Sequence, residues 1–364
     1  MVVKNNLTYE PDYRVHPGEY LEEVLSARGL KKKELAERLN TTDKTISQLI
    51  NKKAYIAPDF ALKLEKVLGI SAEIWNNMSS EYRLFEARVE EQKQLKKDIE
   101  WLKNFPVKDL VNNKFLPDIK DEKAMLSALL AFFGVSDKAT WNKHYDNLLN
   151  YVCCRNSALH KVNEFHLLSW LRAGEVRAQG IQTNDYDRDK FREKINYIRT
   201  LTIKDVSVFV KEMTEACAES GVALTFVPEF TKTHIWGITR WLTPGKALIV
   251  MSLRYKWNDH FWFTFFHEAA HILLHGKKGI FVDSKKTEKS KEEKQADNFA
   301  LNIEVPSDEY NEFVEENNFS IISIRNFAVK QKIHPGIIAG RLAHDGYINH
   351  QTATRFKYRL EFVK

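Results

Sequence analysis

The chain has 364 residues, of which 43% are hydrophobic, and its 55 Lys and Arg residues exceed its 49 Asp and Glu residues to give a net charge of +6. This length predicts two or three domains with full cores, and so modest a charge is compatible with nucleic acid without indicating it. Three cysteines are too few for a disulfide framework. No apolar run reaches the roughly 18 residues of a membrane span, and the amino terminus lacks a signal-like apolar stretch. We therefore expect a cytoplasmic protein with no membrane partner.

The amino-terminal part has the pattern of short helices in close succession, which suggests a helix-turn-helix. The first helix opens at His16-Pro-Gly, and residues 33–39 are predicted to form the first helix of the motif. Thr42 is the expected N-cap of a second helix over residues 43–51. Asn40 lies at the turn, where asparagine tolerates the left-handed conformation.

The second helix of this motif is predicted to contact DNA. Its apolar residues lie on one side, which leaves Lys44, Gln48 and Asn51 on the other. Amide side chains pair with adenine and lysine with guanine in the major groove, so these three are the candidates for base contacts. Residues 28–53 hold eight Lys or Arg against three acidic residues; a helical bundle that binds protein is the alternative. The further candidate DNA contacts are Thr45, Lys31, Lys32 and Lys52, the lysines as phosphate binders.

This region resembles the XRE superfamily, and in particular its HigA-type antitoxin branch. The resemblance rests on His16-Pro-Gly-Glu, Lys33-Glu-Leu-Ala-Glu-Arg-Leu and Thr45-Ile-Ser-Gln-Leu-Ile-Asn-Lys. It implies a five-helix, lambda-repressor-like domain, expected over residues 1–82, that binds an operator as a dimer and in some members neutralises a toxin. A homodimer is also the physical expectation, because one short helix contacts too few base pairs for useful specificity.

Residues 83–218 are expected to be a helical linker or spacer region. Residues 81–103 are predicted to form one long charged helix that extends from the DNA-binding part. Helical spacing of apolar residues follows at 123–134, 141–153, 163–174 and 188–200. We find no catalytic constellation in this region and interpret it as a spacer or sensor module.

The segment from His267 to His271 is the most informative motif of the sequence. Two histidines four apart lie one turn apart on one face of a helix, and Glu268 between them points toward the same metal. Apolar residues surround this helix except at Thr264, the three motif residues and His275. Burying such a polar stripe without a partner costs several kcal/mol, so the pattern favours zinc over a core helix with satisfied histidines.

A third zinc ligand is expected from a second helix, so that the metal keeps an open position for water. Glu293 and Asp297 are one turn apart, so Glu293 can bind zinc while Asp297 accepts the free N–H of a ligand histidine. This is the Glu-x-x-x-Asp arrangement of gluzincin proteases. Glu292 and His275 are alternative third ligands, and an exposed, charged helix is the alternative to a metal site.

Peptide hydrolysis is the expected reaction. Zinc lowers the pKa of a bound water and polarises a carbonyl, while Glu268 accepts the proton of the water and passes it to the leaving amine. Strands are predicted upstream, over residues 222–227, 235–241 and 247–253, and an edge among them could hold an extended substrate. The sequence does not identify the oxyanion donor, for which the candidates are Tyr255, His234, Tyr310, His334 and Arg341.

The carboxy-terminal part resembles the ImmA/IrrE family of zinc metallo-endopeptidases over residues 220–345. The motifs that carry the resemblance are Ser252-Leu-Arg-Tyr, Phe265-Phe-His-Glu-Ala-Ala-His-Ile-Leu-Leu-His, Ala296-Asp-Asn-Phe-Ala and His334-Pro-Gly-Ile-Ile-Ala-Gly-Arg-Leu. The resemblance implies a zincin-like α+β domain, expected over residues 219–364. By motif match His267, His271 and Glu293 would bind zinc and Glu268 would be the general base. One departure is Ala270, which stands where many members carry glycine.

The chain as a whole is therefore expected to be mainly α with a smaller α+β part. We expect a DNA-binding regulator or antitoxin-like protein whose zinc endopeptidase hydrolyses a repressor or toxin partner. A protease bound at its own operator must not act constantly, so its activity is expected to be latent or gated. The alternative is a non-proteolytic HigA-type antitoxin or autorepressor whose protease-like domain is a sensor or partner-binding module.

Overall fold

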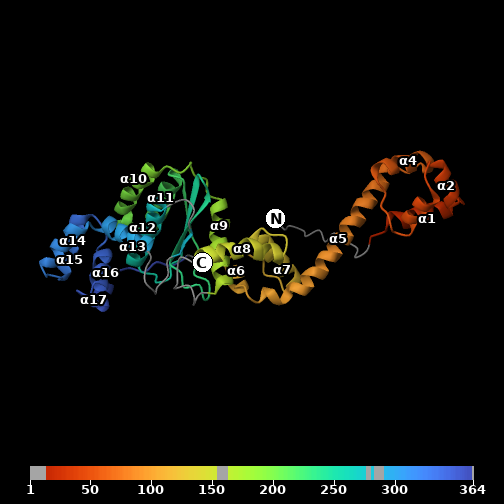
Figure 1. Ribbon diagram of the computed structural model, residues 1–364. Coiled ribbons are helices and arrows are strands. Elements are labelled where there is room, and N and C mark those ends of the chain that lie inside the picture. Colours follow the sequence, from red (N-terminus) through yellow and green to blue (C-terminus); the bar gives the residue numbers. More distant parts are fainter. Residues whose placement is uncertain (1–13, 154–162, 276–279, 283–290, 363–364) are drawn as a thin grey trace, which may run out of the picture. The chain divides into compact units, whose positions relative to one another are not determined.

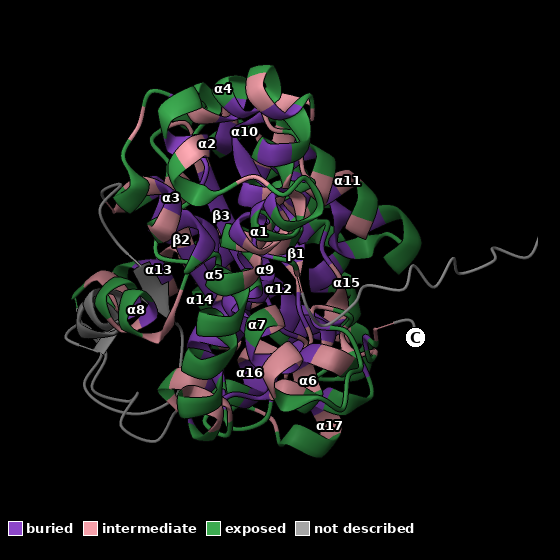
Figure 2. Ribbon diagram, turned by 90° about the vertical axis from the view of Figure 1, so that its right-hand side faces the viewer, coloured by how far each residue is buried: buried purple, intermediate pink, exposed green. Residues whose placement is uncertain are grey.

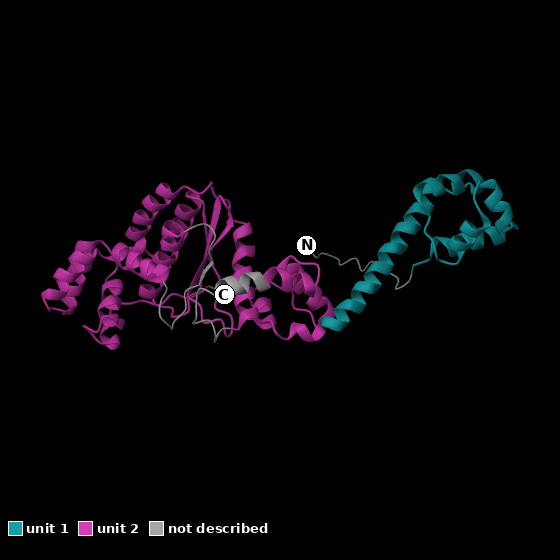
Figure 3. Ribbon diagram, in the orientation of Figure 1, with its two compact units in different colours: residues 1–98 teal, residues 99–364 magenta. Residues whose placement is uncertain are grey.

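The structure is a computed structural model that describes residues 14–153, 163–275, 280–282 and 291–362 (Figure 1). It is mainly helical, with one four-stranded sheet among the described residues. The chain divides into two compact units, residues 1–98 and residues 99–364 (Figure 3). None of the described helices is long and apolar enough to cross a membrane.

The first unit is built on the five predicted helices. They are α1 (Pro17–Ala27), α2 (Lys32–Arg38), α3 (Asp43–Ile50), α4 (Pro58–Leu68) and α5 (Ala72–Leu102), the last of which continues into the second unit. One apolar residue or more from each helix enters a common core, including Leu21, Leu35, Ile46, Leu64 and Trp75. Every one of these five side chains is fully buried, so the amphipathic patterns in the sequence close on a single core.

The turn between α2 and α3 has the predicted local chemistry. The side-chain oxygen of Thr42 accepts a hydrogen bond from the backbone N–H of Thr45 at 3.1 Å and so caps α3. Asn40 has a φ of 50°, the left-handed conformation expected for it. A Cβ at Gly18 of α1 would lie 1.9 Å from the backbone oxygen of Leu49. Only glycine therefore allows α1 to lie this close to α3.

The second unit opens with helices that surround an aromatic cluster. These helices are α6 (Val107–Asn112), α7 (Glu122–Phe133), α8 (Lys138–Cys153) and α9 (Glu164–Gln179). Trp141 stacks on Phe165 with ring centroids 5.2 Å apart, and Phe105 meets Trp141 edge-on at 5.4 Å. These rings form an aromatic cluster between the helices.

The region expected to be a separate spacer, residues 83–218, does not form a compact unit of its own. From residue 99 onward it belongs to the same unit as the carboxy-terminal part. The close fit between α9 and the sheet shows why, because a Cβ at Gly174 would lie 2.3 Å from Cγ2 of Val250. Helix α9 therefore lies directly on the sheet, and residues 191–217 of the same region share the core of the sheet.

The sheet contains β1 (Val222–Phe226), β2 (Gly237–Thr243), β3 (Lys246–Met251) and β4 (Ile280–Val282), in the order β1-β3-β2-β4. β1 and β3 are parallel, whereas β2 is antiparallel to both β3 and β4. Helices α10 (Arg188–Thr200), α11 (Val206–Glu219) and α12 (Asn258–Leu274) lie on one side of the sheet and α9 lies on the other (Figure 1). The residues between these layers are buried (Figure 2).

The chain ends in further helices: α13 (Lys291–Glu304), α14 (Ser307–Glu315), α15 (Ile321–Gln331), α16 (Pro335–His344) and α17 (His350–Thr354). Helix α16 begins in the same way as α1. In both, Nδ1 of a histidine accepts a hydrogen bond from the backbone N–H of a glycine two residues on, at 2.9 Å for His16 and 3.0 Å for His334. The tripeptide His-Pro-Gly thus marks a helix start in both units.

Candidate metal centre

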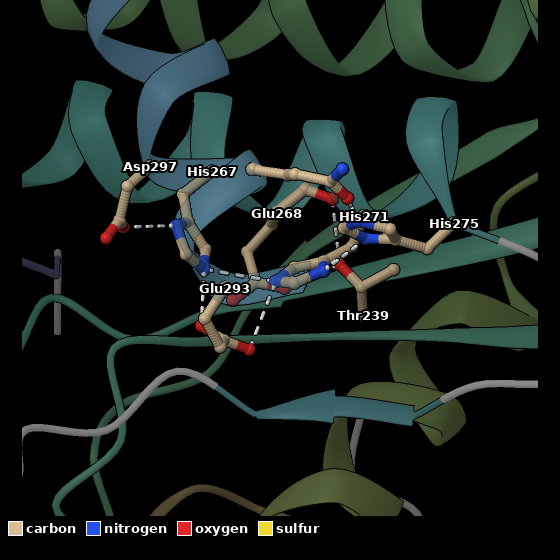
Figure 4. Close-up of polar contacts among 8 residues, drawn as sticks. Thr239, His267, Glu268, His271, His275, Glu293 and Asp297 are labelled. Atoms are coloured by element: carbon tan, nitrogen blue, oxygen red, sulfur yellow. Dashed lines mark hydrogen bonds and ion pairs between the residues drawn. The ribbon is translucent and has the colours of Figure 1, made fainter. Parts of the chain in front are cut away.

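Helix α12 is buried on nearly every side and carries its polar groups toward α13. His267, Glu268 and His271 are all fully buried. From Phe261 onward the other residues of α12, except Thr264, are apolar, and they hold the helix in the core between the sheet and α13. Figure 4 shows that the carboxylate of Glu293, on α13, lies next to the rings of both histidines. Two helices distant in sequence therefore converge on one point.

Three side chains meet there at distances that fit zinc. Nε2 of His267 lies 3.1 Å from Nε2 of His271, and Glu293 places one carboxylate oxygen 3.2 Å from the first and the other 3.5 Å from the second. A tetrahedral zinc with bonds of about 2.0–2.1 Å separates its ligand atoms by roughly 3.3 Å. Among the described residues, this is the group of His, Cys, Asp and Glu side chains close enough to hold a metal ion. Two imidazoles and one carboxylate are donors that zinc prefers.

Each candidate ligand histidine is held by a partner on its other ring nitrogen. Nδ1 of His267 lies 3.0 Å from Oδ1 of Asp297, and Nδ1 of His271 lies 2.9 Å from Nδ1 of His275. Burial, together with His267 and His275, lowers the pKa of His271 well below its ordinary value. A neutral imidazole held in this way presents Nε2 to a cation.

The alternatives for the third ligand take other places. His275 is the residue just beyond α12 and contacts the far nitrogen of His271 instead of joining the cluster. Glu292 precedes Glu293 on α13 but is not part of the metal-sized group. Glycine commonly ends a helix, and the sequence predicts such an end at Gly276, which lies outside the described residues.

The carboxylate of Glu268 is positioned by β2. The hydroxyl of Thr239 donates a hydrogen bond to Oε2 of Glu268 at 2.6 Å. A Cβ at Gly237 would lie 2.8 Å from both Cγ and Oε1 of Glu268, so glycine leaves the space that this side chain fills. Neither residue was predicted to belong to the site, because a threonine and a glycine in a strand carry no signal until the facing helix is known.

Three of the five oxyanion candidates have structural partners among the carboxy-terminal helices and α12. The ring of Tyr310 lies 3.7 Å from the guanidinium of Arg341, and its hydroxyl donates to Asp345. Arg341 also donates to two backbone oxygens at the end of α13, and His334 caps α16 and contacts Asn258. The other two candidates, Tyr255 and His234, lie on the loops that flank β2 and β3.

The candidate DNA contacts lie on the exposed side of α3 and next to it. Lys44, Gln48 and Asn51 are all exposed, as are Lys31, Lys32 and Lys52. Thr45 is half-buried and serves the cap of α3. Two of the predicted phosphate binders have acidic neighbours on α1, since Lys32 pairs with Glu22 at 3.1 Å and Lys52 pairs with Glu19. Such exposed pairs are weak and exchange readily for a phosphate.

Comparison with known proteins identifies both ends of the chain. A family model described as helix-turn-helix matches residues 21–75, and one described as the IrrE N-terminal-like domain, a peptidase family, matches residues 240–330. The uncharacterized helix-turn-helix transcriptional regulator YddM of Escherichia coli K12 is 32% identical over 71 residues, which are 20% of this chain and 76% of the relative. This chain is a helix-turn-helix protein of the XRE type with an IrrE-like domain.

Further relatives match the helix-turn-helix domain. The virulence-associated protein I of Dichelobacter nodosus is 35% identical over 79 residues, 21% of this chain and 73% of the relative. The solved structure of the Pseudomonas aeruginosa antitoxin HigA with the higBA promoter is 30% identical, with 24% of this chain and 95% of that chain covered and a TM-score of 0.22. The match to the IrrE-like domain includes all three candidate ligands and Glu268.

Proposed function

We propose that the protein is a DNA-binding regulator that carries a zinc-dependent endopeptidase for a regulatory protein partner, a repressor or a toxin. The observation that carries the proposal is the convergence of His267, His271 and Glu293, with a buried glutamate beside them. The match to a peptidase family over the same residues supports it. DNA binding is supported by the helix-turn-helix match and by the exposed polar residues of α3.

In the proposed reaction the residues of this chain hold groups and move protons. When bound, zinc would polarise the substrate carbonyl and acidify a water. His267, His271 and Glu293 would hold it, with Asp297 fixing the ring of His267. Glu268 would accept the proton of the attacking water and deliver it to the leaving amine. The hydroxyl of Thr239 holds Oε2 of Glu268 on the β2 side.

Metal content tests the proposed centre. Purified wild-type protein is expected to hold one zinc per chain, and Glu293→Ala is expected to lose it. Glu292→Ala is the matched control, because it removes an identical side chain one position away on α13 and should keep the metal. A metal-free wild type, or equal loss in both variants, would reject Glu293 as a ligand.

Partner cleavage separates the proposal from a non-proteolytic antitoxin. Glu268→Gln should keep zinc and lose hydrolysis, since it keeps the shape of the side chain and removes the base. In cells that carry either form, quantitative proteomics should find a repressor or toxin that accumulates only with Glu268→Gln. Equal levels of every protein would instead favour a domain that senses or binds without cutting.

Operator binding tests the first unit independently. Lys44→Ala with Gln48→Ala should weaken sequence-selective duplex binding while the zinc content stays unchanged. Lys63→Ala, an exposed lysine on α4, serves as the control. Binding to phosphates should also fall as salt rises, because counterions are released. If wild-type protein shows no salt-dependent preference among duplexes, the assignment of α3 to DNA is wrong.

A further inference from the structure

His275 and Gln295 extend the polar contacts of the candidate metal centre outward to solvent. Nδ1 of His271 lies 2.9 Å from Nδ1 of His275, the residue that ends α12 (Figure 4). Nε2 of His275 lies 3.2 Å from Oε1 of Gln295, on α13. His271 is fully buried, His275 is half-buried and Gln295 is exposed. One row of three side chains therefore leads from a candidate ligand to the surface.

Binding of a metal ion at Nε2 of His271 fixes the position of every proton in this row. Nε2 must be unprotonated to bind the ion, so a neutral His271 carries its proton on Nδ1. That N–H can donate to His275 only if Nδ1 of His275 is unprotonated. A neutral His275 then carries its proton on Nε2 and donates it to Oε1 of Gln295. Each donor thus meets an acceptor, and every member of the row is neutral.

The amide group of Gln295 decides the direction of these hydrogen bonds. Its oxygen can only accept, whereas its NH2 group can only donate. An NH2 group facing His275 would reverse every bond of the row and place a proton on Nε2 of His271. That nitrogen lies 3.1 Å from Nε2 of His267 and 3.5 Å from Oε1 of Glu293, so the proton would point into the metal centre. The contact through Oε1 of Gln295 is the orientation that is compatible with a bound metal.

We propose that His275 and Gln295 are positioning residues that set the tautomer of His271 and so prepare its Nε2 for the metal ion. The inference rests on the metal centre of the proposed function, but not on the cleavage of any substrate. Neither residue touches the ion in this role. His275 therefore acts behind a ligand, and Glu293 remains the third ligand.

The positions of the ring protons test this assignment directly. Long-range proton–nitrogen NMR spectra of full-length protein, labelled on the histidine nitrogens, report which nitrogen of each ring carries a proton. Zinc-loaded wild type should carry the proton of His275 on Nε2 and that of His271 on Nδ1. His275→Asn identifies the signals of His275 by their loss. A proton on Nδ1 of His275 overturns the proposal, and so does a shift of either of its nitrogens to the range of a zinc ligand.

Zinc affinity, measured by competition with a chelator, tests the contribution of His275. His275→Ala should weaken binding about 10-fold, because the position is half-buried and water replaces the lost acceptor only in part. His275→Asn should bind within about threefold of the wild type, since its amide oxygen can accept from Nδ1 of His271. His344→Ala is the control and should bind like the wild type, because it removes an exposed histidine of the same unit. Equal affinity of the Ala and Asn variants of His275 overturns the proposal.

Substitutions of Gln295 test the direction of its contact. Gln295→Glu should bind zinc at least as tightly as the wild type, because a carboxylate can only accept. Gln295→Leu should bind roughly threefold more weakly, a smaller loss than in His275→Ala because water reaches this exposed position. Asn298→Glu adds the same charge at another exposed position of α13 and so measures the effect of charge alone. Weaker binding by Gln295→Glu than by Gln295→Leu would overturn the assigned direction.

The outcomes separate this proposal from the proposed function. Zinc affinity that depends on His275, without cleavage of any partner, supports the positioning role and rejects the endopeptidase. Cleavage by the wild type, with unchanged zinc affinity in His275→Ala, rejects the positioning role and leaves the endopeptidase intact. A wild type that binds no zinc overturns both. Far-UV circular dichroism of His275→Ala separates a weaker metal site from a loss of fold, and the NMR spectra of the wild type need no variant that must fold.

Discussion

The contact between Asp297 and His267 predicts a measurable share of zinc affinity. Oδ1 of Asp297 lies 3.0 Å from Nδ1 of His267, and its side chain is only 17% exposed, so water cannot fully replace it. Removing such a partner of a ligand histidine lowers metal affinity about 10- to 100-fold, or roughly 1.4 to 2.7 kcal/mol. Asp297→Ala removes both charge and acceptor and should fall at the upper end. Asp297→Asn keeps an acceptor oxygen and should fall near the lower end.

Competition with a fluorescent zinc chelator measures this loss in the purified full-length variants. Asn298→Ala is the control, because it is exposed and adjacent on α13. Zinc binding by Asp297→Ala within about twofold of the wild type, with unchanged circular dichroism, would refute this role of Asp297. The same result would show that His267 is oriented by its packing alone.

Three further predictions follow from buried positions. Gly237→Ala should lower the proposed peptide hydrolysis about 100-fold with zinc retained, because the new Cβ would displace Glu268; unchanged turnover would contradict this. Burial, followed by the charge of Asp259, raises the pKa of Glu304 well above 4.5. The folded chain therefore keeps a proton on Glu304 that the unfolded chain releases. The free energy of unfolding should fall as the pH rises above about 4.5. Thermal melts across this range should show a smaller fall for Glu304→Gln, and equal slopes would argue against the assignment. Gly18→Ala should destabilise the first unit by about 1–3 kcal/mol, measured as faster hydrogen exchange in α1 and α3; exchange at the wild-type rate would show that α1 can shift without cost.

Local patterns predicted the elements well wherever one side of a helix meets a core. The Thr42 cap, the left-handed Asn40 and the five-helix order all follow from neighbours within a few residues. The strands upstream of α12 were also predicted within two residues at each end, because short apolar runs between turn residues are typical of buried strands.

Contacts between distant segments could not be predicted in the same way. The polar stripe of α12 was predicted as one set of five residues, but the structure separates their roles. His275 lies past the last turn and contacts His271, and Thr264 lies against Gly237 of β2 instead of joining the metal-sized group. Counting the charged residues of the first unit also could not predict that Lys32 and Lys52 pair with glutamates of α1, because these partners lie elsewhere in the sequence.

The predicted domain boundary near residue 218 could not be tested from the sequence pattern for a related reason. Helical periodicity indicates where helices occur but not which surface they cover. Gly174 lies close to Val250 because α9 packs directly on the sheet. The spacing of apolar residues along α9 does not predict this packing. The helical region from residue 99 therefore joins the unit of the candidate metal centre.

The register of β2 has a consequence for how this chain can vary in length. Thr239 faces Glu268, while the next residue, Arg240, pairs with Glu175 on the other side of the sheet. Inserting or deleting one residue before Thr239 would exchange these two faces and bring a guanidinium against the carboxylate of Glu268. The irregular pairing between Trp241 and Thr243 lies beyond this point. Insertions should therefore be tolerated only on that side, toward the turn into β3.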